Sequence, residues 1–138
     1  MDLKHLGHQS QDAVDELDLI AWEGRPITIT LEATEFTSHC PVTRQPDFGR
    51  IRVEYVPGDH IIETKSWKLF LWQFRERAEF NEVIVNTLGD EIWSQAKPRA
   101  LRVTGMFNLR GGIGVSACYE VDPEGLLPST APARHPQG

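Results

Sequence analysis

The chain is organised around one stretch, Glu63-Thr64-Lys65-Ser66-Trp67-Lys68-Leu69-Phe70-Leu71-Trp72-Gln73-Phe74. Its apolar residues Trp67, Leu71 and Phe74 recur at i, i+4 and i+7, the spacing that places side chains on one face of a helix. Lys65 and Lys68 are three residues apart and share another face, toward solvent or an anionic ligand. Taken alone, the stretch is typical of an amphipathic helix whose lysines extend into solvent.

On the C-terminal side, the sequence predicts a second helix from about Phe80 to Ala96, with Phe80, Ile84, Leu88 and Ile92 on one apolar stripe. Two helices in direct succession are expected to pack as an antiparallel pair. A strand over residues 101–107, a turn over 108–112 and a hairpin partner over 113–119 follow.

On the N-terminal side, alternating apolar and polar residues predict half-buried strands over residues 27–32 and 51–55. Between them we expect a long loop, residues 34–49, punctuated by Pro41, Pro46 and Gly49. A loop of that length in a compact domain is more often functional than not.

These elements give the order β-β-α-α-β-β, which predicts an α+β fold: a four-stranded antiparallel sheet covered on one face by the helix pair. We expect residues 1–24, which are polar and acidic, to form an N-terminal arm that docks on a neighbour. Residues 25–121 form the domain, and residues 122–138, rich in proline and small side chains, form a flexible C-terminal tail.

Composition narrows the function classes. The 138-residue chain has a formal net charge of −6, which disfavours binding to nucleic acid, because such binding rests on neutralising phosphates. It has only two cysteines, Cys40 and Cys118, and no apolar run of membrane-spanning length. We therefore expect a cytoplasmic protein that binds neither nucleic acid nor a membrane.

The predicted long loop contains a candidate nucleophile, Cys40, between His39 and Pro41. A cysteine attacks an electrophile near neutral pH when neighbours such as His39 or Arg44 stabilise its thiolate. Asp47 lies seven residues further on, and the two prolines of the loop can fold a carboxyl group back toward the thiol. The alternative interpretation, a small buried hydrophobic residue, suits Cys118 in its strand better than Cys40.

Two other places contain candidate binding groups. Glu63 and Glu82 begin the two predicted helices, and a carboxylate in such a position could accept hydrogen bonds from paired donors of a ligand. Arg110, Gly111 and Gly112 form either a simple hairpin turn or a site where backbone N–H groups approach an anion. No Gly-x-Gly-x-x-Gly follows a strand, so a Rossmann site is not supported.

Together these motifs resemble the unimodular QueF family of NADPH-dependent 7-cyano-7-deazaguanine (preQ0) nitrile reductases. The family patterns Phe-Thr-Ser-x-Cys-Pro and Gln-Pro-Asp-Phe both occur here with unaltered spacing, and the family Arg-Gly-Gly occurs at Arg110. The stretch from Glu63 fits the family signature except at Thr64, and the family Phe-His-Glu is replaced by Phe80-Asn81-Glu82. The resemblance covers about Pro26 to Glu120.

The resemblance implies the tunnelling fold (T-fold), whose subunits join sheet edges into a barrel, here a homo-oligomer of two stacked pentamers with active sites at subunit interfaces. It implies reduction of preQ0 to the aminomethyl compound in queuosine biosynthesis, a tRNA modification, without a metal. Cys40 would form a thioimide with the nitrile and Asp47 would donate a proton. The remaining roles implied are substrate binding by Glu63, Thr64, Asn81 and Glu82, and NADPH binding by Lys65, Lys68, Arg110 and Gly111.

Three alternatives remain open from the sequence. An amidine-forming or ammonia-transferring enzyme would use the same thioimide without NADPH; Thr64 and Asn81 motivate it. A zinc hydrolase resembling GTP cyclohydrolase I would need several ligands at suitable spacing, and only His39, Cys40 and His60 are candidates. The third is a non-catalytic protein that binds a deazapurine.

Overall fold

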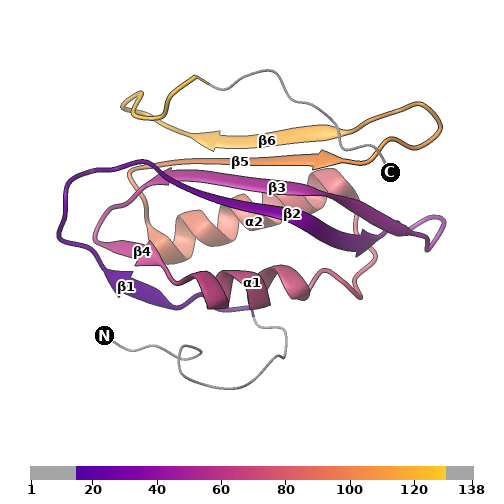
Figure 1. Cartoon of the computed structure of the whole chain (residues 1–138), viewed down its shortest axis with the longest axis horizontal. Helices are drawn as coiled ribbons and strands as arrows, with labels where there is room; N and C mark the ends of the chain where they lie inside the picture. The colour runs from indigo at the N-terminus through magenta and orange to yellow at the C-terminus, as the bar shows by residue number, and fades with distance from the viewer. Residues whose placement is uncertain (1–14, 130–138) are drawn as a thin grey trace.

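The computed structural model describes residues 15–129. A four-stranded antiparallel sheet has the order β2-β3-β5-β6, and β1 pairs with β4 in a separate two-stranded sheet. Figure 1 shows α1 and α2 running in opposite directions beneath one face of the larger sheet, so the predicted α+β architecture is confirmed. The elements are β1 (Leu19–Ala21), β2 (Ile29–His39), β3 (Pro46–Val56), β4 (His60–Ile62), α1 (Thr64–Trp72), α2 (Asn81–Ala96), β5 (Ala100–Phe107) and β6 (Ser116–Val121).

The predicted loop over residues 34–49 was wrong, because most of this segment belongs to β2 and β3. A β-bulge between Ala33 and Phe36 inserts one extra residue into β2 and breaks the simple alternation of apolar and polar side chains. Beyond the bulge the alternation resumes, with Phe36 and Ser38 buried. β3 begins at Pro46, a position where a missing N–H is tolerated. The true connection is the short turn 40–45.

A second difference is the β1–β4 pair, in which Leu19–Ala21 runs antiparallel to His60–Ile62. The segment before β1 is held by the same chain's helices: the Leu17 N–H donates to Gln95 Oε1 at 2.8 Å, and the Asp18 N–H donates to Ser66 Oγ at 3.0 Å. Three-residue strands leave too little periodicity to be read from sequence.

The hydrophobic core lies between the sheet and the two helices. As predicted, Trp67, Leu71 and Phe74 of the organising stretch are buried in it. The stripe of α2 is buried at Ile84, Leu88 and Ile92, whereas Phe80 precedes the helix and is 53% exposed. The helices are therefore fixed to the sheet by these aliphatic and aromatic contacts, which provide the main free energy of folding.

The hairpin between β5 and β6 turns at Gly111 and Gly112, which both have positive φ angles, 56° and 79°. Two consecutive residues of this kind make the tight turn that matches the twist of a hairpin. Paired backbone hydrogen bonds of 2.9 Å join Arg110 and Ile113 across it. β6 itself begins at Ser116, three residues later than the sequence predicted.

Residues 122–129 pack against the sheet. Leu127 is buried with Val56 and Ala100, and Asp122 accepts hydrogen bonds from the N–H groups of Leu126 and Leu127. These hydrogen bonds lower the pKa of Asp122. The division of the chain into an arm (1–24), a domain (25–121) and a tail (122–138) stays a prediction.

Replacing Gly89 with alanine tests how closely α2 packs on β6. A Cβ at Gly89 would lie 2.3 Å from Cγ of the Tyr119 ring, and the Tyr119 hydroxyl is tied to Asp90 Oδ1 at 2.9 Å. Alanine favours a helix by about 1 kcal/mol, but overpacking costs about 1–3 kcal/mol, so we expect a net loss of unfolding free energy by urea denaturation. In a Tyr119→Ala background the same substitution should stabilise; equal effects in both backgrounds would contradict this packing.

Candidate active site

The turn after β2 positions the candidate nucleophile. The Cys40 N–H donates to the Gln45 carbonyl at 3.0 Å, and the Cys40 carbonyl accepts from the Arg44 N–H at 2.9 Å. Arg44 adopts the left-handed conformation with φ 61°, which closes the turn before β3. Cys40 is half-buried and forms no disulfide. The hairpin thus holds the thiol at one end of the sheet.

The turn also activates the thiol. Hydrogen bonds from the backbone and side chain of Thr43, then from the backbone of Val42, lower the pKa of Cys40, while burial and the charge of Asp47 act in the opposite direction. The groups that stabilise the thiolate are therefore turn N–H and hydroxyl donors rather than His39 or Arg44, which the sequence indicated. A lowered thiol pKa provides more of the nucleophilic thiolate near neutral pH.

Asp47 lies at the same end of the sheet as Cys40 because β2 and β3 form a hairpin. Ser38 is the cross-strand partner of Asp47, so the carboxylate and the turn lie at the same end of the sheet. The Asp47 side chain is only 13% exposed, and its Oδ1 is 3.1 Å from Arg110 Nε. The structure therefore brings together three of the predicted site residues, from the β2–β3 and β5–β6 turns.

The start of α2 is attached to the same end. The linker before α2 bridges the last residue of β2: the His39 N–H donates to the Arg77 carbonyl at 3.2 Å, and the Glu79 N–H donates to the His39 carbonyl at 3.1 Å. Asn81 and Glu82 follow directly in the first turn of α2. Glu82 is exposed, and Asn81 Oδ1 is buried without a hydrogen-bond partner among the described residues.

Glu63 has a different position from the other predicted site residues. It is the N-cap of α1, and its two carboxylate oxygens accept hydrogen bonds of 2.8 Å from the N–H groups of Lys65 and Ser66. Only 7% of the residue is exposed. A nine-residue helix is about 13 Å long, so α1 separates Glu63 from the linker that approaches His39.

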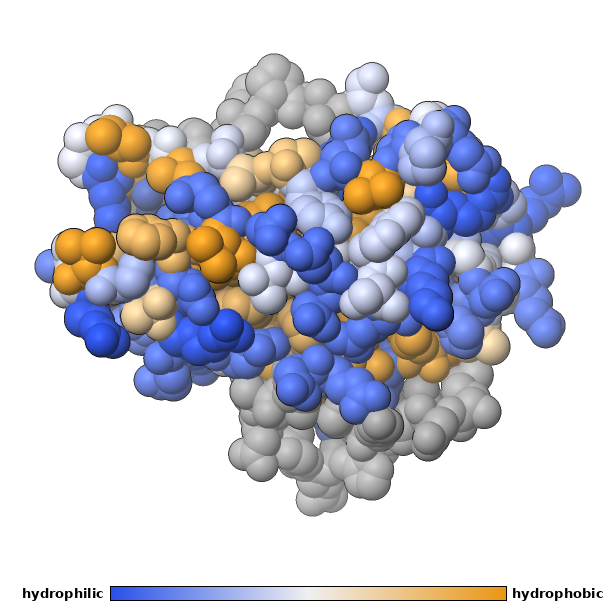
Figure 2. All heavy atoms as spheres, turned by 180° about the vertical axis from the view of Figure 1, so that it is seen from behind, coloured by the Kyte–Doolittle hydropathy of each residue, from blue (hydrophilic) through white to orange (hydrophobic). Residues whose placement is uncertain are grey.

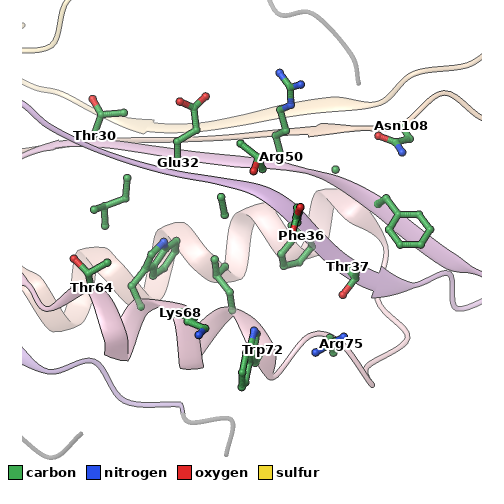
Figure 3. A pocket seen from close by; sticks show the side chains of 18 residues that line it. Thr30, Glu32, Phe36, Thr37, Arg50, Thr64, Lys68, Trp72, Arg75 and Asn108 are labelled. Carbon is green, nitrogen blue, oxygen red and sulfur yellow. The ribbon is translucent and has the colours of Figure 1, made fainter. Parts of the chain in front are cut away.

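A groove of about 1110 Å³ follows the free edge of β2 above α1 (Figure 3). Thr64 and Lys68 line it from α1, with Trp72 and Arg75 further along. The Lys68 ammonium lies 4.9 Å from the centre of the Trp72 ring. Phe48, the neighbour of Asp47, also lines the groove. The groove therefore extends from Thr64 toward the end that carries Cys40.

The same end exposes apolar side chains. Figure 2 shows the molecule from behind, and apolar residues are exposed at its left edge, where the turns 40–45 and 108–115 lie. Val42 is 75% exposed and Ile113 is 69% exposed. Exposed apolar residues gathered around a functional end are typical of an interaction surface.

Sequence analysis missed two polar residues of the site. Thr43 stabilises the Cys40 thiolate, and Gln45 accepts a hydrogen bond from Arg110 at 3.2 Å. Both lie between the motif cysteine and the motif aspartate, so the turn chemistry of that segment was the available signal.

Within residues 15–129 no helix is long and apolar enough to cross a membrane.

Comparison with known families identifies the group to which this chain is related. The family described as "QueF: QueF-like protein" matches residues 46–124, which is more than half of the chain. The chain belongs to the QueF-like family. The match includes Asp47, both helices and the hairpin turn.

Several curated proteins resemble this QueF-like chain. A protein of Anaeromyxobacter dehalogenans (strain 2CP-C) is 47% identical over 105 residues, which cover 75% of this chain and 86% of that protein. One of Exiguobacterium sibiricum is 36% identical over 131 residues, 90% of this chain and 81% of that protein. Both are named NADPH-dependent 7-cyano-7-deazaguanine reductase.

A solved structure, the archaeosine synthase QueF-Like in the apo form, superimposes with a TM-score of 0.65 at 23% identity. The match covers 70% of this chain and 95% of that chain. It supports the T-fold predicted from the sequence.

Proposed function

We propose that this QueF-like protein reduces the nitrile of 7-cyano-7-deazaguanine to the aminomethyl compound with two NADPH, in queuosine biosynthesis. The observation that carries the proposal is the pairing of a Cys40 thiol of lowered pKa with Asp47 at one end of the sheet. The family and the names of the relatives identify the nitrile on which such a pair acts. They favour the reductase over the amidine-forming, hydrolytic and non-catalytic alternatives.

In the proposed reaction the Cys40 thiolate adds to the nitrile carbon and forms a C–S bond. The Asp47 carboxylate first accepts the proton of the Cys40 thiol. The nitrile nitrogen receives the displaced electron pair and takes this proton back from Asp47, which gives a thioimide. Thr43 holds the sulfur as thiolate before the attack. Bound NADPH supplies hydride, twice, because conversion of a nitrile to an amine takes four electrons.

We propose that Glu82 and Asn81 bind the deazaguanine beside Cys40, because they begin α2 at the end that the linker attaches to β2. A carboxylate can accept hydrogen bonds from the adjacent ring N–H and amino group of the base. Glu63 and Thr64 complete the proposed substrate site. Because α1 separates them from Cys40 of the same chain, they would serve the site of a neighbouring subunit.

For NADPH we propose Lys65, Lys68, Arg110 and Gly111. The groove above α1 is large enough for a dinucleotide. Its charged lining residues are Arg50, Lys68 and Arg75, with Glu32 and Glu35. Within residues 15–129, no atom other than those of its chain neighbours lies within 4 Å of the Cβ position of Gly111, so a phosphate could approach the backbone there. These residues fit an anionic cofactor, although Arg110 would have to share its donors with Asp47.

The oligomeric assembly and the cellular location of the protein are proposals as well. We propose a homo-oligomer, two stacked pentamers, with each active site at a subunit interface. Within residues 15–129, β2 and β6 each have one unpaired edge, which edge-to-edge assembly would cover. The free cysteines Cys40 and Cys118 suit a reducing cytoplasm.

Purified protein mixed with 7-cyano-7-deazaguanine and NADPH tests the function. We expect two NADPH to be oxidised for each aminomethyl product, followed by absorbance and mass spectrometry. Without NADPH, a thioimide adduct on Cys40 is expected. Adduct that is never discharged as the amine when NADPH is added would exclude the reductase and favour the amidine-forming alternative.

Replacing Asn81 with histidine tests one of the two motif positions, Thr64 and Asn81, where this chain differs from the family pattern. Asparagine offers a hydrogen bond but cannot relay a proton near neutral pH. If a histidine adds acid–base catalysis to the reduction, we expect the NADPH-dependent rate to rise, by at most the roughly 10²–10⁴-fold that such catalysis provides. Adduct formation without NADPH should be nearly unchanged. An equal or slower reduction would show that the site works with asparagine.

A further inference from the structure

Arg110 connects three segments that meet at the end of the sheet carrying Cys40. Its Nε lies 3.1 Å from Asp47 Oδ1, its Nη1 donates to Gln45 Oε1 at 3.2 Å, and its Nη2 donates to the Pro46 carbonyl. All three nitrogens of the guanidinium are thus directed at the start of β3 and the preceding turn. Figure 1 shows the β2–β3 and β5–β6 turns at the same end of the molecule.

Backbone hydrogen bonds hold the turn that carries Arg110. Its hydrogen bonds with Ile113 close the Gly111-Gly112 turn, and the Asn108 N–H donates to the Phe48 carbonyl at 2.8 Å. The base of the turn is thereby fixed to β3 beside Asp47. An arginine whose backbone is anchored in this way loses less conformational entropy when it forms an ion pair.

We propose that Arg110 is a positioning residue for the nucleophile: it compensates the charge of Asp47 and fixes the turn 40–45, and so maintains the reactivity of Cys40 before substrate or cofactor binds. The proposal rests on the proposed function for its catalytic meaning, since Cys40 and Asp47 are the residues proposed to attack and protonate the nitrile. This positioning role of Arg110 is distinct from its proposed role in binding the phosphates of NADPH, because positioning does not require the cofactor.

The physical reason is the charge of Asp47. An uncompensated carboxylate near a thiol disfavours the thiolate, and Asp47 indeed raises the pKa of Cys40 against the hydrogen bonds of Thr43. Because Asp47 is mostly shielded from solvent, the compensating charge of Arg110 is screened less than at a fully exposed pair. Other charged or titratable groups at this end are His39, Arg44, Glu82 and the ion pair of Arg77 with Glu79.

The test is the rate at which iodoacetamide alkylates Cys40 as a function of pH, in a Cys118→Ser background and without substrate or cofactor. In Arg110→Gln we expect the midpoint of the pH profile to rise by about one pH unit, a loss of roughly tenfold in rate below both midpoints. Arg110→Lys retains the charge and should recover most of the shift. Mass spectrometry identifies the alkylated cysteine.

The decisive comparison repeats Arg110→Gln together with Asp47→Asn. If Arg110 acts through the charge of Asp47, Arg110→Gln should shift the midpoint of the alkylation profile little once Asp47→Asn is present. A matched control is Arg99→Gln, because Arg99 is 42% exposed, as Arg110 is 43% exposed, and pairs with Glu124 at 2.9 Å away from Cys40. It should leave the profile unchanged.

Two results would overturn the proposal: an unchanged midpoint in folded Arg110→Gln, or a shift of equal size with and without Asp47→Asn. Circular dichroism verifies folding of each variant. If Arg110→Gln does not fold, Arg110→Met, which also removes the charge, is compared with and without Asp47→Asn in the same way. No nitrile or NADPH enters the experiment, so its failure is distinguishable from failure of the proposed reductase activity.

Discussion

Replacing Cys40 with alanine should abolish NADPH oxidation in the presence of 7-cyano-7-deazaguanine, with a loss of at least about 10⁴-fold in turnover. The sulfur of Cys40 forms the proposed bond to the nitrile carbon, and no other cysteine of the sequence lies in the turn 40–45. Steady-state absorbance gives the rate, and mass spectrometry of the protein with the nitrile alone should show no adduct.

Cys118→Ser is the matched control for this loss. Cys118 is exposed on β6, and its sulfur accepts a long hydrogen bond of 3.8 Å from the Thr104 hydroxyl. We expect turnover and adduct formation close to those of the parent protein. Residual turnover of Cys40→Ala within tenfold of the parent would show that the reduction does not proceed through a thioimide on this residue.

Replacing Arg102 with methionine should produce a large loss of stability. Glu54 has a side chain that is only 3% exposed, and Arg102 Nη1 lies 3.5 Å from its carboxylate. Arg102 also donates to Glu120 Oε1 at 2.7 Å and to the Pro128 carbonyl at 2.9 Å. Without Arg102 the buried carboxylate keeps only Arg52, whose Nε lies 3.5 Å from Glu54 Oε1. We therefore expect the free energy of unfolding to fall by about 3 kcal/mol, the lower end of the cost of breaking a buried ion pair.

Urea denaturation at one fixed protein concentration measures this loss, because assembly would make the apparent stability depend on concentration. Arg99→Met removes the exposed pair with Glu124 and should cost at most about 1 kcal/mol. Adding Glu54→Gln to Arg102→Met should recover part of the loss. If Arg102→Met and Arg99→Met lower the free energy of unfolding equally, burial of Glu54 does not determine the loss of stability.

The sequence by itself determined the helices, the β5–β6 hairpin and the motif residues of the nucleophile segment. Helix periodicity and hairpin turns involve neighbours a few residues apart, so Trp67, Leu71 and Phe74 could be assigned to one buried face before any packing was known. Cys40 and Asp47 are likewise close along the chain, and a hairpin brings them to the same end of the sheet.

The tertiary structure alone decided what those residues touch. The bulge near Ala33, beyond which β2 continues to His39, is set by pairing with β3, since one extra residue leaves no distinct periodic signal. Glu63 is the N-cap of α1, because its carboxylate accepts hydrogen bonds from the first N–H groups of that helix. Arg110 meets Asp47 from far along the chain, because packing of four strands into one sheet brings their turns together, and local sequence patterns contain no information about such a contact.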